Sequence, residues 1–231
     1  MQVTLMIEWT NRNTWIGVFD ILGFKNLLRQ AEQDYSRALL IEKLDELIES
    51  INSLPFKHGK LDYTIFSDTF VIFTPDSEPK SYAWFICACK NLIEKSIYLE
   101  LPLKGAISIG PAFISISPPI ILGSSFVEAY EYCEDQDWIG LLLTPTATAT
   151  IRSHGLEPLH HDFVNDKQIP LRTKSPEGVL AYRFQNGSAN FDSPFFPHLR
   201  QMQHLAPRWN QKDKYERTIA FIQKHYRHSS A

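Results

Sequence analysis

The sequence predicts an α+β fold, in which helices cover one face of a mainly antiparallel sheet, with the element order β-α-β-β-α-β-α-β as far as His154. Three observations predict it. Thr14–Leu22 is short and almost wholly apolar, which is typical of a buried strand. Leu61–Asp68 and Thr69–Thr74 alternate or run apolar around a polar Ser-Asp-Thr, which indicates a hairpin. The segments between these strands have apolar residues at the 3.6-residue helical period.

The helical pattern begins after Gly23, and it fits one long helix or two helices separated near Asp34 and Ser36. The elements after the hairpin are expected as a helix over Lys80–Leu99, a strand over Leu101–Ile109 that ends at a Gly110–Pro111 break, a helix over Ser124–Asp135 capped by Ser124 or Ser125, a strand over Gly140–Thr144 and a helix over Pro145–His154.

The chain is long enough for one large domain with an appendage, and we place the boundary between residues 14–167 and residues 168–231. The second segment is expected to pack on the core or on a dimer partner, because its aromatic residues Phe191, Phe195, Phe196 and Trp209 need cover. It should contain a hairpin of Ile169–Lys174 with Val179–Phe184, a loop over Asn186–Pro197 and an amphipathic helix over Gln211–Tyr226.

Composition excludes several classes of protein. The 231 residues are 44% hydrophobic and carry a net charge of −3, so no basic field favours nucleic acid as a partner. The 3 cysteines form no CxxC pair, which argues against a disulfide framework or a structural zinc site. No apolar run is long enough to span a membrane, and Glu8, Arg12 and Asp20 interrupt any signal-peptide pattern. We therefore expect a cytoplasmic protein.

Two aspartates stand where chemistry is expected. Asp20 ends a buried strand and Asp68 lies at the tip of the hairpin, and in a βαββ unit these places converge at one edge of the sheet. Paired carboxylates favour a divalent metal, to which the carbonyl of Ile21 can add an oxygen. The N–H groups of Gly23 and Phe24 open a helix and suit phosphate. Taken singly, Asp20 can instead be a helix cap and Asp68 a turn residue.

The motifs around these aspartates resemble those of class III nucleotidyl cyclases. Phe19–Phe24 (FDILGF) resembles the first-strand motif of that family, and Ser67–Asp68 matches its second metal aspartate. Lys104–Gly110 resembles the next strand, and Ile121–Tyr130 resembles the glycine-led helix that completes the catalytic core. The resemblance covers about residues 14–150 and implies a ferredoxin-like βαββαβ core.

The resemblance also implies a mechanism. Two divalent ions, Mn²⁺ or Mg²⁺, would be held by Asp20, Asp68 and the Ile21 carbonyl. They would activate a ribose 3′-hydroxyl against the α-phosphate of a nucleoside triphosphate and stabilise the departing pyrophosphate. The family places its sites between two head-to-tail catalytic domains, which implies a homodimer with active sites at the interface.

This sequence departs from the family at four places. Thr64 and Ile120 stand where purine cyclases carry base-reading polar side chains, and Val127 and Glu131 stand where the family has an asparagine and an arginine. A transition-state cation must then come from elsewhere. Lys104 is the first candidate, with a solvated edge lysine as the alternative interpretation. Weaker candidates are Arg152, Arg172 and Lys174.

These departures and the short chain are similar to the pyrimidine cyclases of bacterial anti-phage signalling (the Pycsar type). That subgroup implies UTP or CTP as substrate and cyclic UMP or cyclic CMP as a second messenger. It also implies Thr64 next to the nucleobase, with Phe24 or Tyr63 in the wall of the nucleobase pocket. Two alternatives stay open: a purine cyclase of the same fold, and a catalytically degenerate cyclase-like domain that binds nucleotide or a partner.

Overall fold

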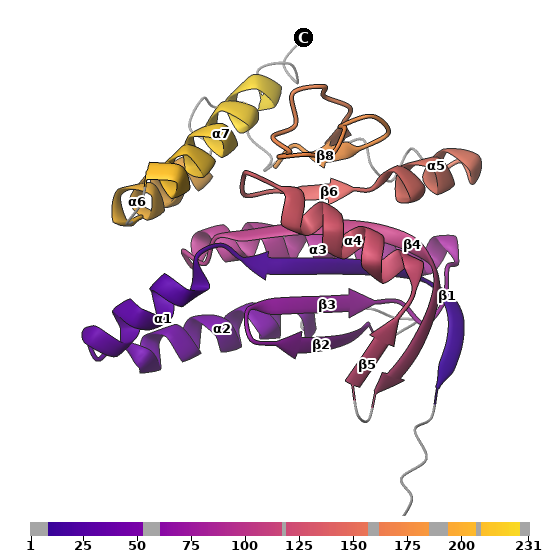
Figure 1. The fold of residues 1–231 in the computed structure, drawn as a ribbon, viewed down its shortest axis with the longest axis horizontal. Helices are drawn as coiled ribbons and strands as arrows, with labels where there is room; N and C mark the ends of the chain where they lie inside the picture. Colours follow the sequence, from indigo (N-terminus) through magenta and orange to yellow (C-terminus); the bar gives the residue numbers. More distant parts are fainter. Residues whose placement is uncertain are drawn as a thin grey trace, which may run out of the picture.

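The computed structural model describes residues 9–52, 61–116, 119–156, 162–184, 194–206 and 209–226, which form one sheet with helices around it (Figure 1). The strands are β1 (Thr10–Ile21), β2 (Asp62–Phe66), β3 (Thr69–Phe73), β4 (Leu103–Ile116), β5 (Pro119–Leu122), β6 (Leu141–Leu143), β7 (Phe163–Val164) and β8 (Leu180–Tyr182). The helices are α1 (Phe24–Gln33), α2 (Arg37–Asn52), α3 (Pro79–Tyr98), α4 (Ser124–Asp135), α5 (Pro145–Ser153), α6 (Phe195–Leu205) and α7 (Trp209–Tyr226).

The strand order is β2-β3-β1-β4-β6-β8-β7, with β5 paired to β4. β1 is central and antiparallel to β3 on one side and to β4 on the other, while β4 and β6 are parallel. The predicted α+β fold with a mainly antiparallel sheet is confirmed. Within it, Asp20 lies opposite Thr69 of β3 and Lys104 of β4.

Helix α3 packs on one face of the sheet and carries α2, with α1 packed on α2, as predicted, and α4 is the exception. The lack of a side chain at Gly17 of β1 allows α3 to pack closely on the strand, because a Cβ atom there would lie 3.2 Å from the Cζ atom of Phe85 on α3. α4 packs across β1 and β4 on the other face, where the Cys133 thiol donates to the carbonyl of Lys104. Figure 1 shows α4 in front of the sheet and α3 behind it. Alternation along β1 therefore turns Asp20 toward the face of α4.

Most predicted elements up to residue 154 are confirmed, including the hairpin, the helix over Ser124–Asp135 and two helices in place of one long helix after Gly23. The expected break at Gly110–Pro111 is wrong, because β4 continues through it with Pro111 opposite Asn13. The expected cap is also wrong. Gly123 is the N-cap residue of α4, and the Ser125 hydroxyl instead donates 3.3 Å to the carbonyl of Pro111.

The C-terminal segment differs more from expectation. β8 pairs with β6 and with β7, not with Ile169–Lys174, so the predicted hairpin is wrong. The expected loop over Asn186–Pro197 lies partly outside the described residues and partly inside α6. Because β7 precedes residue 168 and β8 follows it, the sheet crosses the boundary that we placed there.

The amphipathic helix is confirmed as α7, and α6 packs beside it. Phe195 is buried against Tyr98 of α3, with the ring centroids 5.2 Å apart. Within the described ranges, no helix is both long enough and apolar enough to cross a membrane.

Candidate active site

Asp20 and Asp68 meet at one edge of the sheet. The backbone N–H of Ile21 donates 3.1 Å to the carbonyl of Asp68, which fixes the tip of the β2–β3 hairpin against the end of β1. Ser67 has a φ of 58° in the turn that presents Asp68. The two carboxylates are close enough that Asp68 helps to raise the pKa of Asp20. The structure thus brings together the two residues that the sequence predicts as metal ligands.

Lys104 lies beside Asp20 inside the protein. Its Nζ atom is 3.3 Å from a carboxylate oxygen of Asp20 and 2.8 Å from one of Glu134 on α4. Only 4% of its surface is exposed, so the interpretation as a solvated edge lysine is excluded. Burial by itself lowers the pKa of Lys104, but the neighbouring Cys133, Glu134 and Asp20 together raise it above its usual value. Lys104 is therefore a charged ammonium shared between two carboxylates.

The environment of Asp20 disfavours its negative charge. Burial raises the pKa of this carboxyl group above its ordinary value, Lys104 opposes the shift, and Asp68 and Glu134 add to it. Two carboxylates at one edge with one shared lysine leave an excess of negative charge when both are ionised. Such perturbed carboxyl groups gather at functional sites, although structural ion pairs can also produce them.

The donor set fits Mg²⁺ or Mn²⁺. Both side chains and the Ile21 carbonyl present oxygen, which hard cations prefer, and Mg²⁺ is commonly held by one or two carboxylates together with substrate phosphates. A cation between Asp20 and Asp68 would also relieve their mutual repulsion. Within the described residues no group of three or more His, Cys, Asp or Glu side chains forms a metal cluster, so phosphate and water would complete the coordination.

Gly23 and Phe24 lie next to the carboxylates, where α1 begins. Gly23 is the N-cap residue with a φ of 76°, and no side-chain hydrogen bond caps the helix. The N–H of Asn26 donates 2.8 Å to the carbonyl of Gly23, and within the described residues those of Phe24 and Lys25 are left for a ligand. Gln211 of α7 comes close, because a Cβ on Gly23 would lie 3.2 Å from its Nε2 atom. A cavity of about 350 Å³ opens between α1 and α7, with Gly23, Gln211 and Tyr215 in its wall. This end of α1 is suited to an anionic ligand.

Thr64 and Tyr63 border a second cavity, of about 480 Å³, between the β2–β3 hairpin and β5. Thr64 shares the sheet face of Asp20, while Tyr63 points to the opposite face, where Asn52 donates 3.2 Å to its hydroxyl. Ser115 also lines the cavity, and its hydroxyl is buried without a hydrogen-bond partner in the described part of the chain. Phe24 begins α1 and does not line this cavity, so it does not share a wall with Tyr63.

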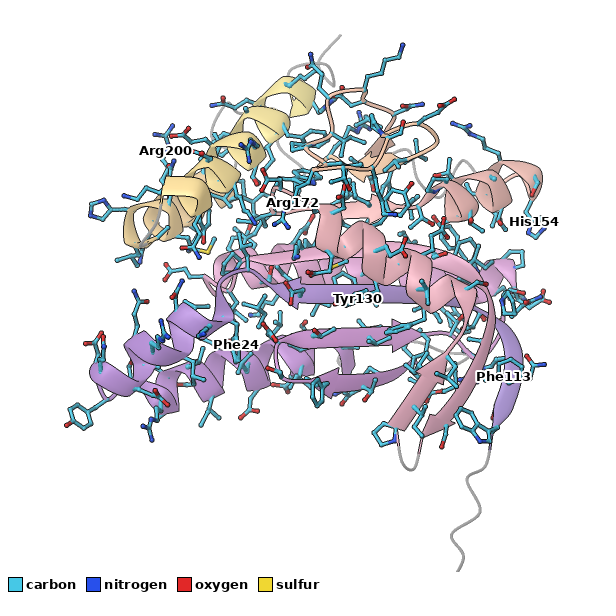
Figure 2. The ribbon with its side chains drawn as sticks, viewed as in Figure 1. Phe24, Phe113, Tyr130, His154, Arg172 and Arg200 are labelled. Atoms are coloured by element: carbon cyan, nitrogen blue, oxygen red, sulfur yellow. The ribbon has the colours of Figure 1, made fainter. Side chains whose placement is uncertain are left out.

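The positions of the family's asparagine and arginine lie on the outer side of α4. Val127 is half exposed, and Glu131 forms a 2.8 Å ion pair with Lys174. Tyr130 projects from the same side (Figure 2). Of the weaker candidate cations, Arg152 is exposed on α5, whereas Arg172 lies near the end of α4, 3.7 Å from Asp137.

Sequence reasoning missed Glu134, Ser115 and Lys214. Lys214 is 8% exposed on α7, in a row with the buried Thr218, Phe221 and Ile222. That row was visible in the sequence as a lysine on the apolar stripe of an amphipathic helix. Glu134 and Ser115 had no such signal, because their partners come from distant parts of the chain.

No known family profile and no curated protein matches the chain. Solved structures do. The adenylyl cyclase CyaB from P. aeruginosa has a TM-score of 0.56 at 14% identity, over 79% of this chain and 98% of that one. A bacterial light-regulated adenylyl cyclase has a TM-score of 0.52 at 12% identity, over 84% of this chain and 99% of that one. The catalytic core of a rhodopsin-guanylyl cyclase with converted specificity has a TM-score of 0.51 at 13% identity, over 76% of this chain and 96% of that one. The chain has the fold of class III nucleotidyl cyclase catalytic domains.

Proposed function

We propose that this protein is a metal-dependent nucleotidyl cyclase that converts a pyrimidine nucleoside triphosphate into a 3′,5′-cyclic monophosphate and pyrophosphate. One observation carries the proposal: Asp20 and Asp68 meet at a single sheet edge beside the uncapped N-terminus of α1. Carboxylates for cations and free N–H groups for phosphate are the two requirements of a site for a metal-bound triphosphate.

Three groups of residues have separate roles in the proposed reaction: metal ligands, phosphate-binding amides and the buried Lys104. Asp20, Asp68 and the Ile21 carbonyl would hold two ions, Mn²⁺ or Mg²⁺, which when bound would neutralise the attacking and leaving oxygens of the displacement. The amides of Gly23 and Phe24 bind phosphate oxygens. Lys104 holds the Asp20 carboxylate in place, and Glu134 gives this lysine a second partner when a cation approaches Asp20.

The cavity at Thr64 supports a pyrimidine substrate, UTP or CTP. Thr64 and Ser115 bring aliphatic hydroxyls to it, each able to donate or accept, while the Tyr63 hydroxyl accepts from Asn52. Its one carboxylate, Asp62, lies 3.4 Å from Arg12 and is engaged there. Apolar walls from Phe73 and Ile121 with two hydroxyls suit a small ring with one or two polar edges. A cyclic UMP or cyclic CMP product would serve as a second messenger in anti-phage defence, as the resemblance to the Pycsar type implies.

The proposal includes a homodimer. The cavity is lined by Phe73 of β3, whereas Asp20 lies opposite Thr69 of the same strand. These two places are four residues apart along β3, so the cavity and the carboxylates of one copy are separated by about 13 Å. A second copy in head-to-tail orientation can bring its cavity to the carboxylates of the first. Exposed apolar side chains on this side of the sheet support such an interface: Phe66 is 83% exposed, Val127 50% and Tyr130 47%.

A second candidate function has its own observation. Val127 and Glu131 leave the outer side of α4 without the family's charge, and Lys104 already neutralises Asp20. Both features favour a cyclase-like domain that binds nucleotide without turnover. A purine cyclase that reads its base through other contacts is the third possibility.

Product identification separates the three. Purified protein is incubated with Mn²⁺ and equimolar ATP, GTP, CTP and UTP, and the products are identified by mass spectrometry. The proposal expects mainly cyclic UMP or cyclic CMP, because unpaired polar groups on a purine cost roughly 1–3 kcal/mol each in this pocket. Dominant cyclic AMP or GMP would establish the purine alternative, and nucleotide binding without any cyclic product would establish the binding domain.

The dimer is tested separately by light scattering during size-exclusion chromatography. A mass near twice 26.7 kDa is expected. A monomer that still forms cyclic nucleotide would overturn the shared-site arrangement.

A further inference from the structure

The charge that develops on departing pyrophosphate needs a cation, and the obvious candidates are engaged. Lys104 is shared between Asp20 and Glu134, and Lys174 pairs with Glu131 at 2.8 Å. The position of the family's arginine is itself the acidic Glu131. Beyond the two ions, a cation from another element would add to the stabilisation of that charge.

Helix α7 passes close to the start of α1 and to the end of α4 that carries Glu134. Near its start, Gln211 reaches the N-terminus of α1 at Gly23. Lys214, one turn further, belongs to the buried stripe of α7 and turns toward Asp137, two residues beyond α4. The same end of α4 carries Glu134, the partner of Lys104. Lys214 thus stands one turn after the residue that contacts Gly23 and pairs with a carboxylate just beyond the Glu134 end of α4.

Three cations surround the single carboxylate of Asp137, and we name Arg172, Lys214 and Arg217 the Asp137 cluster. The Lys214 Nζ atom is 3.6 Å and the Arg172 Nε atom 3.7 Å from Asp137, and Arg217 donates to the same carboxylate. Figure 2 shows Arg172 between α4 and α7. The cluster therefore carries more positive than negative charge, which suits a polyanionic ligand.

The charges around Lys214 repel one another. Burial lowers its pKa, Arg172 and Lys104 lower it further, and Asp137 only partly opposes them. Since a buried lysine surrounded by like charges is costly, an anionic ligand would stabilise this arrangement. Arg217 is 42% exposed, whereas Lys214 is 10% exposed by side chain, so Lys214 is the cation shielded from solvent.

We propose that Lys214, supported by Arg172, binds the β- and γ-phosphates of the substrate and stabilises pyrophosphate as it leaves. This inference rests on the proposed function. In the step, the bond from the ribose 3′-oxygen to the α-phosphorus forms and the bond from that phosphorus to the bridging oxygen breaks. Pyrophosphate takes the bonding electron pair, and the 3′-hydroxyl proton passes to water. The C-terminal helix then supplies the charge that α4 lacks.

The test measures pyrophosphate binding to the full chain by calorimetry with Mn²⁺, for wild type, Lys214→Met and Lys214→Arg. Loss of one charged donor should weaken binding by roughly 10- to 100-fold in Lys214→Met and lower cyclic product formation by a similar factor. Lys214→Arg, which keeps the charge, should retain most of the binding. Lys214→Met that binds pyrophosphate as tightly as wild type would overturn the proposal.

Lys224→Met is the matched control, because Lys224 is also a lysine of α7 in an ion pair, 2.7 Å from Asp166, at the other end of the helix. It should bind pyrophosphate like wild type, and an equal loss in both variants would show a purely structural role for Lys214. In Lys214→Met, Asp137 still pairs with Arg172 and Arg217, so the fold should persist. Lys214→Gln provides a second uncharged variant. Because binding needs no turnover, a wild-type protein that binds pyrophosphate without cyclising nucleotide would refute the proposed function and leave this test intact.

Discussion

Asp20 and Asp135 are both shielded carboxyl groups, and the structure treats them in opposite ways. At the end of α4, the Asp135 carboxylate accepts from the Thr173 hydroxyl at 2.6 Å and from the N–H groups of Thr173 and Lys174 at 3.0 and 2.9 Å. Burial alone would raise its pKa, but these hydrogen bonds lower it below the ordinary value. Asp20 has the shared Lys104 as its cationic partner, and burial raises its pKa.

Under the proposed function, the difference separates a structural carboxylate from a metal ligand. Asp135 holds the loop at residues 172–174 to α4 and needs nothing further. Asp20 is left with charge that the protein does not fully compensate, beside a second carboxylate and an uncapped helix. Proteins tolerate such incomplete compensation at sites where a ligand completes it.

Removing the charge of Asp20 should give the largest effect. In Asp20→Asn or Asp68→Asn, cyclic nucleotide formation should fall by at least about 10³-fold, because a metal ligand and its charge are lost. The melting temperature of metal-free Asp20→Asn should be unchanged or higher, since folding disfavours the charged form of this group. Product assays and calorimetric unfolding measure the two quantities. Near-wild-type turnover in either variant would remove the metal assignment.

Asp135→Asn should show the reverse pattern. Loss of charge-assisted hydrogen bonds to Thr173 and Lys174 should lower the free energy of unfolding by about 1–3 kcal/mol. Turnover measured well below the melting temperature should stay within a few-fold of wild type. Urea unfolding and product assays on one preparation test both points. A thousand-fold loss of activity with unchanged stability would place Asp135 in the site and end the comparison.

The stability difference between wild type and Asp135→Asn should depend on pH. Folding lowers the pKa of Asp135, so its carboxylate stabilises the fold at pH above 3.8 and this contribution is lost as the pH falls through the lowered value. The difference should therefore be full at pH 7 and shrink below about pH 3.8. Asp20→Asn should behave oppositely, with a gain at neutral pH that disappears on acidification as wild-type Asp20 becomes protonated. Urea unfolding between pH 7 and pH 3 measures both, and a constant Asp135→Asn difference would contradict the account.

The smallest effect is expected at Lys174. Its ion pair with Glu131 is partly exposed, with side-chain accessibilities of 28% and 53%. Such pairs contribute at most about 1 kcal/mol, so Lys174→Ala should change stability by less than Asp135→Asn. Thermal unfolding of the two variants side by side makes the comparison. A larger loss in Lys174→Ala would mean that the side chain of Lys174, not the hydrogen bonds to Asp135, holds the loop.

The contrast also shows what the sequence could reveal. Asp20 and Asp68 were predictable because each follows a locally readable element, an apolar strand and a hairpin. α4 was predictable for the same reason. The partner of β8 was not, because Leu143 and Leu180 are paired across a long stretch of chain. Pro111 indicated a strand end by its missing N–H, yet the long pairing with β1 carries β4 past it.

The residues of the proposed site follow the same division. Lys104 was recognised by its place in a strand, but whether it was solvated or buried depended on Glu134, which no local pattern links to it. Lys214 was readable as a lysine on the apolar stripe of a helix, but its contact with Asp137 is non-local and had no signal in the sequence. Tyr63 and Phe24 were both placed at the nucleobase, yet Tyr63 lies opposite Ile72 in the β2–β3 hairpin and Phe24 begins α1 beyond the end of β1. Periodicity assigns a residue to an element, and tertiary pairing decides what the residue meets.

Manganese binding tests the central claim most directly. Free Mn²⁺ is quantified by electron paramagnetic resonance during titration of wild type, Asp20→Asn and Asp135→Asn, each with a non-cyclisable triphosphate analogue. The account predicts two ions bound per nucleotide in wild type and in Asp135→Asn, and loss of that binding in Asp20→Asn. Equal Mn²⁺ binding by wild type and Asp20→Asn would contradict the assignment of the Asp20–Asp68 edge as the metal centre.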